Sequence, residues 1–268
     1  VDSSPRGTPK KFHNHAYGEH TQIVWNGVIG RIELFSVEPM HLTDVQVFPN
    51  VEKRSIRIES RISNGEDRAA RGSLTCTARL RNAPTEEHFT TRHSFEVGGV
   101  DDPVIVTELS LGPDALLWDD FSPNLYELDV VLENDSPDAT TDRRHVTFGL
   151  RDIGVRGTQF ILNGRVLFLR GTHDAGNAPL TGYPDMDVES WRRIYRIGKS
   201  YGLNHWRFHS WTPPEAAFTA ADEEGIILQS EMVQFAEIGK TFPPRTAFDD
   251  QWRRQEMSRI LKAYGNHP

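Results

Sequence analysis

The chain has 268 residues, of which 37% are hydrophobic and 25% are charged, a composition typical of a globular protein rather than a disordered or fibrous one. Its formal net charge of −8 argues against nucleic acid as a partner, because phosphates select surfaces rich in lysine and arginine. The sequence has no apolar run of about 18 residues, so it predicts no membrane-spanning helix and no membrane partner.

Cysteine and histidine placement bears on metal sites and disulfides. The single cysteine, Cys76, excludes a disulfide within the chain and a thiolate metal cluster. It lies in the alternating segment SLTCTARL, so we expect a small buried core residue. Three histidines near the start, His13, His15 and His20, lack the helical i, i+4 pairing of a zinc motif, which favours a solvated loop. We therefore expect neither a metal site nor a cofactor.

Short runs in which apolar and polar residues alternate fill the chain between Gly30 and Phe148, as in strands with one buried face. Turn residues separate these runs, among them Asn64-Gly65 and Gly98-Gly99. About seven strands at this spacing predict an antiparallel β-sandwich of the immunoglobulin-like type. The segments are GRIELFSV, VQVFPNV, SIRIESRIS, GSLTCTARL, HSFEVGG, VIVTELSL, LYELDVVLE and HVTFGLRDI.

After Val155 the pattern changes to strands that alternate with helices. The predicted strands are RVLFLRG at 165–171, LNHWRFHS at 203–210 and IILQSE at 226–231. Short strand–helix connections indicate a parallel sheet covered by helices. Three such units make fewer than half of an eight-fold (β/α)8 TIM barrel.

Three helices are predicted in the same half. The first spans 186–202, with Asp187 as its N-cap and Gly202 at its C-terminal end. The second spans 213–225, with proline at its start and glycine at its end, and the third spans 248–265. In the first helix the apolar residues that recur at helical spacing are Trp191, Ile194, Ile197 and Tyr201.

Functional residues of a parallel sheet or barrel collect at the carboxyl ends of its strands. Residues two apart in a strand share a face, so His205, Arg207 and His209 are predicted to lie on one face and Trp206 and Phe208 on the other. The apolar pair suits the face covered by helices, so polar Arg207 and His209 are predicted to point to the interior. A buried arginine costs free energy unless it meets an anion or hydrogen-bond acceptors. Either a substrate pocket or a structural ion pair would meet that need.

The ends of the other two predicted strands add candidates. Glu231, at the end of the third strand, is suited to pair with Arg207 or to contact a ligand hydroxyl, and the sequence leaves both open. His173 and Asp174 follow the first strand and are candidates for the site. Asp174 is equally suited to a site role and to capping the loop. Trp211 is suited either to stack on a sugar ring or to lie in the core.

Taken together, six segments resemble glycoside hydrolase family two, the group of β-galactosidases, β-glucuronidases and β-mannosidases. They occur in the family's order over essentially the whole chain and are closer to the β-galactosidase and β-glucuronidase side. The segments are HTQIVWNGVIGRIEL, LWDDFSPNLYELDVVL, FGLRDI, FILNGRVLFLRGTH, YGLNHWRFHSWTPPEAAFTAADEEGIILQSE and YGNHP.

The resemblance implies a domain order and a reaction. Residues 1–37 would be the tail of a jelly-roll sugar-binding domain, 38–151 an immunoglobulin-like β-sandwich domain, and 152–268 the N-terminal part of a TIM-barrel catalytic domain. Family members hydrolyse terminal β-glycosides, such as β-galactosides or β-glucuronides in oligo- or polysaccharides, with retention of configuration. That mechanism needs two carboxyl groups about 5 Å apart. The resemblance places both glutamates after Pro268, so we expect a fragment that is inactive alone.

The resemblance also assigns roles. Arg207 matches a family arginine that helps to organise the site. Glu231 matches a glutamate that some β-galactosidases use in a magnesium site with a histidine two residues later, but Val233 stands at that position here. His209 is one position away from the family's histidine. The expected substrate-binding residues are His173, Asp174, Arg207, His209, Trp211 and Glu231.

Two further expectations follow. The alternative function is a non-catalytic carbohydrate-binding or scaffold module, which shares the expected carbohydrate partner. An incomplete barrel would leave open strand edges and an unopposed inner face, so we expect exposed apolar surface there or self-association through it. The family is compatible with a periplasmic or secreted location, which the residues themselves do not decide.

Overall fold

The computed structural model describes residues 28–268 except for five internal segments. These segments are 66–67, 82–86, 100–101, 136–139 and 233–246. The described residues form two compact units. The first, called here the sandwich unit, contains residues 34–168 and 265–268, and the second, the parallel-sheet unit, contains residues 28–33 and 169–264.

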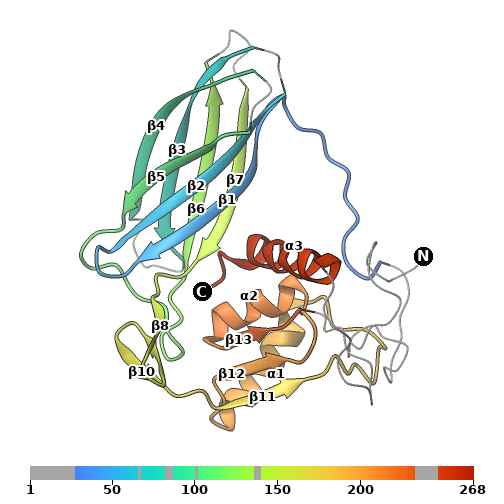
Figure 1. The fold of residues 1–268 in the computed structure, drawn as a ribbon. Helices are drawn as coiled ribbons and strands as arrows, with labels where there is room; N and C mark the ends of the chain where they lie inside the picture. The colour runs from blue at the N-terminus through green and yellow to red at the C-terminus, as the bar shows by residue number, and fades with distance from the viewer. Residues whose placement is uncertain (1–27, 66–67, 82–86, 100–101, 136–139, 233–246) are drawn as a thin grey trace. The chain divides into compact units, whose positions relative to one another are not determined.

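Two antiparallel sheets make up the main part of the sandwich unit (Figure 1). Among the described residues, one sheet has the strand order β1-β2-β5 and the other has the order β4-β3-β6-β7. Their burial alternates along each strand, as the sequence predicts for sheets with one buried face. The strands are β1 Met40–Asn50, β2 Ser55–Asn64, β3 Ala70–Leu80, β4 His88–Val97, β5 Val104–Ser110, β6 Tyr126–Asn134 and β7 Thr141–Phe148.

The core of the sandwich unit lies between its two sheets. It includes Ile58 and Leu74, which are fully buried and come from different sheets. Cys76 is also fully buried, as predicted, with its Sγ 3.6 Å from the hydroxyl of Thr107. Burial raises the pKa of the Cys76 thiol, against a smaller lowering by the Thr107 hydrogen bond, so the thiol stays protonated at neutral pH.

One predicted strand of this region is absent. The segment GRIELFSV, residues 30–37, forms no strand in the described structure. Its apolar side chains Ile32, Leu34 and Phe35 are 82%, 100% and 71% exposed. An alternating pattern becomes a strand only when a neighbouring strand pairs with it, and no pairing of this segment occurs among the described residues.

Tyr126 connects the start of β6 to the preceding loop. Its hydroxyl accepts a hydrogen bond from the Leu116 amide at 2.7 Å and donates one to the Leu116 carbonyl at 3.3 Å. Its ring stacks on Phe148 with 5.4 Å between ring centroids. The single side chain therefore satisfies both backbone groups of one loop residue.

We expect Tyr126→Phe to lower the free energy of unfolding by about 1–2 kcal/mol, because the ring stays while the Leu116 amide loses its partner. Chemical denaturation would measure this change. Tyr201→Phe is the matched control, since Tyr201 is 82% exposed and should change stability little. Equal stability of the two variants would contradict the role given to the Tyr126 hydroxyl.

A small antiparallel sheet follows β7, with the order β10-β9-β8. Its strands are β8 Ile153–Arg156, β9 Gln159–Leu162 and β10 Arg165–Leu167. Asn163 and Gly164 have φ values of 51° and 81°, the left-handed pair of a two-residue hairpin turn. The prediction that residues 165–171 form the first parallel strand is therefore wrong. The Asn-Gly turn folds β10 back onto β9, and the parallel sheet begins only at Gly171.

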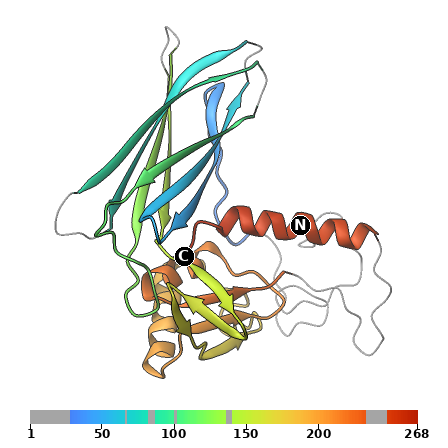
Figure 2. The same ribbon diagram turned by 60° about the vertical axis from the view of Figure 1, so that its left-hand side comes forward.

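The main part of the parallel-sheet unit, seen in Figure 2, alternates three strands with three helices. Its strands form a sheet with the order β11-β12-β13. Both strand pairings are parallel, as predicted. None of the described helices combines the length and apolar character needed to cross a membrane. The elements are β11 Gly171–Asp174, α1 Val188–Ser200, β12 His205–Phe208, α2 Glu215–Glu224, β13 Ile227–Ser230 and α3 Ala247–Tyr264.

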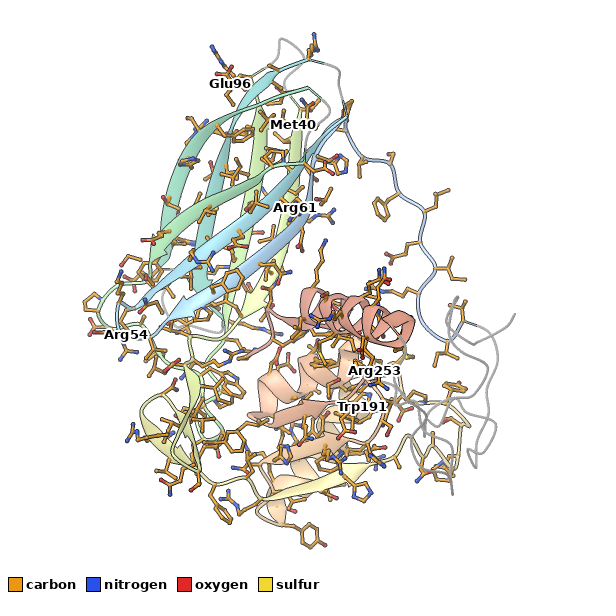
Figure 3. All side chains as sticks on the ribbon, in the orientation of Figure 1. Met40, Arg54, Arg61, Glu96, Trp191 and Arg253 are labelled. Atoms are coloured by element: carbon orange, nitrogen blue, oxygen red, sulfur yellow. The ribbon has the colours of Figure 1, made fainter. Side chains whose placement is uncertain are left out.

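Helix α1 begins and ends where the sequence predicts. The Asp187 side chain accepts a hydrogen bond from the Ser190 amide at 3.0 Å, and Gly202 follows the helix with a φ of 83°. The buried face differs from the prediction, because Ile197 and Tyr201 are 51% and 82% exposed. Of the named residues Trp191, which is labelled in Figure 3, is buried, and Tyr195 and Gly198 are buried with it in place of the other two.

One apolar cluster joins the helices to the sheet. It contains Trp191 and Tyr195 of α1, Phe208 of β12 and the alanines of α2, with Trp206 and Leu228 packed against it. Helices α1 and α2 therefore cover one face of β12 and β13. This arrangement leaves the alternate side chains of the strands on the opposite face.

Candidate functional site

Polar side chains lie in register across the three parallel strands. His173 of β11 is paired with Arg207 of β12, and Arg207 is paired with Gln229 of β13. Phe208, the next residue of β12, is fully buried in the cluster under the helices. Because successive side chains of a strand point to opposite faces, Arg207 lies on the face away from the helices, as predicted.

Arg207 forms an ion pair with Glu231, which comes directly after β13. The Arg207 Nε lies 2.5 Å from Glu231 Oε1, and the two side chains are 38% and 16% exposed. Gln229 Nε2 donates to the same oxygen at 3.3 Å. The salt-bridge alternative is therefore present in the structure, and it provides the anion that the arginine needs.

The second oxygen of Glu231 is also used. The backbone amide of Ser210 donates to Oε2 at 2.8 Å. Ser210 has a φ of 62°, a left-handed conformation that is unusual for a residue with a side chain. The hydrogen bond to Glu231 offsets the cost of that conformation. Glu231 therefore shapes the turn after β12 as well as holding Arg207.

Several interactions set the charge of Glu231. Burial by itself would raise the pKa of Glu231, but the hydrogen bonds from Arg207 and the Ser210 amide, the Arg207 charge and the His209 hydrogen bond together lower it. A lowered pKa keeps the carboxylate ionised at neutral pH. Glu231 is consequently suited to positioning cations and amides, and it is poorly suited to donating a proton as a general acid.

His209 lies beside the same ion pair. Its Nδ1 is 3.2 Å from Arg207 Nη2 and 3.4 Å from Glu231 Oε2. Its ring meets the His173 ring nearly edge-on, with 6.1 Å between centroids. The fold therefore brings together four predicted site residues from the ends of three strands.

Asp174 and Trp211 support this site from the chain around it. Asp174 Oδ1 accepts a hydrogen bond from the Gly176 amide at 2.7 Å. Asp174 therefore caps the loop, one of the two roles considered for it from the sequence. The Asp174 carbonyl accepts from the His209 amide at 2.8 Å and from the Trp211 indole at 3.1 Å. Burial raises the pKa of Asp174, against smaller lowering effects of the Gly176 amide and His173.

Trp211 lies in the core, which is the second of the two alternatives given for it. Its ring is 3% exposed and meets Phe208 edge-on, with centroids 5.2 Å apart. The buried ring fixes the loop after β12, and in this structure it offers no face for a sugar ring.

Two contributors, Ser210 and Thr212, escaped prediction, and a third, His205, was placed on this face but not among the site residues. Ser210 and Thr212 hold Glu231 through the Ser210 amide and a 3.2 Å bond from the Thr212 hydroxyl to the Glu231 carbonyl. His205 lies on the open face, and its pKa is lowered by burial and then by the Arg207 charge. His205 was recognisable from its spacing to Arg207, whereas no sequence signal marks the left-handed turn at Ser210.

The open face of the sheet carries mostly polar side chains. Within the described strands β11 to β13, none of the residues is an exposed large apolar one. The expected exposed apolar surface is therefore not found on these strands, where the positions on this face are Gly171, His173, His205, Arg207, Gln229 and the half-buried Ile227. Self-association through this face stays a prediction.

Metal-binding side chains do not gather in the described part of the chain. No cluster of three or more His, Cys, Asp or Glu side chains suited to a metal ion occurs there. His13, His15 and His20 lie outside the described residues.

Residues 40–151 match the family model of the glycosyl hydrolases family 2. The chain is 24% identical over 266 residues to a β-galactosidase of Photobacterium profundum, covering 96% of this chain and 25% of that protein. It is 27% identical over 158 residues to a β-galactosidase of Thermoanaerobacterium thermosulfurigenes, covering 58% of this chain and 20% of that protein. The chain thus spans about a quarter or less of these relatives.

Solved structures show the same fold. A β-glucuronidase of Bacteroides uniformis matches with a TM-score of 0.72 at 20% identity, covering 87% of this chain and 28% of that one. A family-2 β-galacturonidase of Eisenbergiella tayi, solved with galacturonate, matches with a TM-score of 0.70 at 21% identity, covering 87% and 40%. The resemblance recognised from the six sequence segments is confirmed.

Proposed function

We propose that this chain, which is similar to the family-2 glycosyl hydrolases in sequence and fold, is part of a retaining β-glycosidase that acts on terminal β-galactosides or β-glucuronides. The match of residues 40–151 to the family model and the β-galactosidase relative aligned over 96% of the chain support this. Since the chain spans about a quarter of that relative, we propose the activity for the complete protein and not for this chain alone.

In this proposal β11, β12 and β13 with their helices are the first three units of a (β/α)8 barrel. Their parallel order supports it. The sandwich at 38–151 would be the immunoglobulin-like domain, residues 1–37 the tail of a jelly roll, and 152–268 the start of the barrel. A barrel of this kind places its active site at the carboxyl ends of its strands, where Arg207 and Glu231 meet.

The observation that carries the proposal is the anchored arginine at these strand ends. Glu231 holds the guanidinium of Arg207 by one oxygen, and the arginine side chain remains 38% exposed. A fixed and accessible guanidinium suits hydrogen bonding to sugar hydroxyls or a sugar carboxylate. We propose that Arg207, His209 and His173 form one wall of the sugar pocket, positioned by Glu231, Asp174 and Trp211.

The two carboxyl groups near this wall do not suit the catalytic roles. Glu231 is ionised and engaged through both oxygens, so it is a poor general acid. Asp174 has a raised pKa, as a general acid needs, but its Oδ1 caps the loop through the Gly176 amide, and the retaining mechanism requires a second carboxyl group for which Glu231 is not suited. We therefore propose that the acid/base and the nucleophile come from elsewhere in a complete enzyme, and that the 268-residue chain alone does not hydrolyse glycosides.

We expect the isolated chain to release no nitrophenol from nitrophenyl β-galactoside or β-glucuronide above a buffer blank, because neither Glu231 nor Asp174 suits the role of one of the paired carboxyl groups. The complete protein encoded around this chain should hydrolyse one of the two. Turnover by the isolated chain that is lost in Glu231→Ala would contradict the proposal. Sugar binding measured by calorimetry, together with an inactive complete protein, would instead favour a carbohydrate-binding module.

A further inference from the structure

The outer edge of strand β1 is closed by side chains. In the described part of its sheet, β1 is the outermost strand next to β2, so one row of its backbone groups has no strand to pair with. Near the start of β1, Asp142 accepts from the Leu42 amide at 2.7 Å, and Arg144 donates to the Leu42 carbonyl at 2.8 and 3.1 Å. These two residues come from β7 of the other sheet.

The middle of the same strand is closed by Asn266, more than two hundred residues later in the chain. Its Oδ1 accepts from the Val47 amide at 2.8 Å, and its Nδ2 donates to the Val45 carbonyl at 2.8 Å. One primary amide thus offers an acceptor and a donor to the strand in the way that a neighbouring peptide group does. The ionised aspartate side chain has the same shape but offers acceptors only, so the donor to Val45 requires the amide.

The residues after Asn266 are held by the same unit. The His267 carbonyl accepts from Arg151 Nη2 at 3.3 Å. A Cβ placed on Gly149 would lie 2.6 Å from Pro268 Cβ and 2.7 Å from Trp118 Cβ, so a glycine is needed for this close approach. Residues 265–268 accordingly belong to the sandwich unit, although the helix that precedes them, α3, belongs to the parallel-sheet unit.

We propose that Asn266 is a positioning residue whose amide fastens the segment Gly265–Pro268 to the edge of β1 and so directs the chain after α3. The two hydrogen bonds hold the side chain, and the Gly149 and Arg151 contacts hold the two residues behind it. The inference does not rest on the proposed glycosidase activity.

Amide hydrogen exchange in the intact chain tests the inference at the Val47 amide. We expect Asn266→Ala to raise the Val47 exchange rate at least about tenfold, because its hydrogen-bond partner is removed. Asn50→Ala is the matched control, since Asn50 lies on the same strand and its side chain accepts only locally, from the Lys53 amide. That control should leave the Val47 rate unchanged.

The isosteric change Asn266→Asp separates hydrogen bonding from filling of space. Its carboxylate still accepts from Val47, so Val47 should stay protected, but it places an oxygen against the Val45 carbonyl where a donor stood. We expect a lower midpoint of thermal unfolding for Asn266→Asp than for the wild type. A Val47 rate that is unchanged in Asn266→Ala, or wild-type stability of Asn266→Asp, would overturn the proposal. The second measurement decides even if the alanine variant fails to fold.

Discussion

Replacing Phe208 with alanine is expected to lower the free energy of unfolding of the parallel-sheet unit by about 3–5 kcal/mol, the largest effect of any single change considered. The Phe208 side chain is fully buried at the centre of the cluster that joins α1 and α2 to the sheet. Its ring meets Trp191 and Trp211 edge-on, at centroid distances of 5.8 and 5.2 Å. Alanine would leave a cavity between two indole rings, and tryptophan fluorescence during denaturation would report the loss.

Two further variants make this measurement specific. Phe208→Leu keeps most of the buried volume and should cost less than Phe208→Ala. Leu180→Ala removes an apolar side chain of the same unit that is 99% exposed, so its stability should change by less than about 0.5 kcal/mol. Comparable losses in Phe208→Ala and Leu180→Ala would show that the cluster does not hold this unit together.

Replacing Glu231 with alanine is expected to cost about 2–3 kcal/mol, the second largest effect, because two charge-assisted hydrogen bonds are lost together. Arg207 would lose its anion, and the amide of Ser210 would lose its acceptor while its backbone remains left-handed. The cost is below that of breaking a deeply buried pair, since Arg207 is 38% exposed. Denaturation at neutral pH would measure it.

The pH dependence of this effect has a definite sign. The pKa of Glu231 is lowered in the folded state, so the ionised carboxylate stabilises the fold fully above the unfolded value of about 4.3. As the pH falls below that value and through the folded pKa, this contribution is lost. The stability difference between the wild type and Glu231→Gln should therefore be constant near neutral pH and shrink below about pH 4.

Glu108→Gln provides the reference for this titration, because Glu108 is exposed on β5 and its replacement should change stability little. A difference between the wild type and Glu231→Gln that stays constant down to about pH 2, below the range of ordinary carboxyl groups, would contradict the charge-based role. Full stability of Glu231→Ala would show that the turn at Ser210 needs no anchor.

Much of the fold was predictable because it depends on local pattern. Alternation identified the seven sandwich strands, and the N-cap Asp187 and the glycine after α1 marked the ends of that helix. Local pattern failed where pairing decides. Residues 30–37 alternate like a strand but have no described strand beside them. The apolar run at 165–171 is not one strand, because its first three residues pair with β9 across a hairpin turn and its last residue begins the parallel sheet.

The candidate site was predictable to a similar degree. The two-residue period of β12 placed Arg207 on one face and Phe208 on the other, since that period is a property of any extended chain. Whether Glu231 meets Arg207, and whether Trp211 is buried, depends on how strands far apart in sequence align. Sequence alone left both pairs of alternatives open; the structure shows Glu231 paired with Arg207 and Trp211 buried against Phe208.

The sequence by itself determined the family resemblance, the order of strands and helices and the face on which Arg207 lies, because each is encoded in residues close together along the chain. Only the tertiary structure decided that Glu231 accepts hydrogen bonds from Arg207 and Ser210, and that Asn266 hydrogen-bonds to the edge of the strand formed by residues 40–50. The hydrogen bonds of Glu231 and of Asn266 both connect residues that are far apart in the sequence. Their geometry exists only once those parts of the chain have folded together.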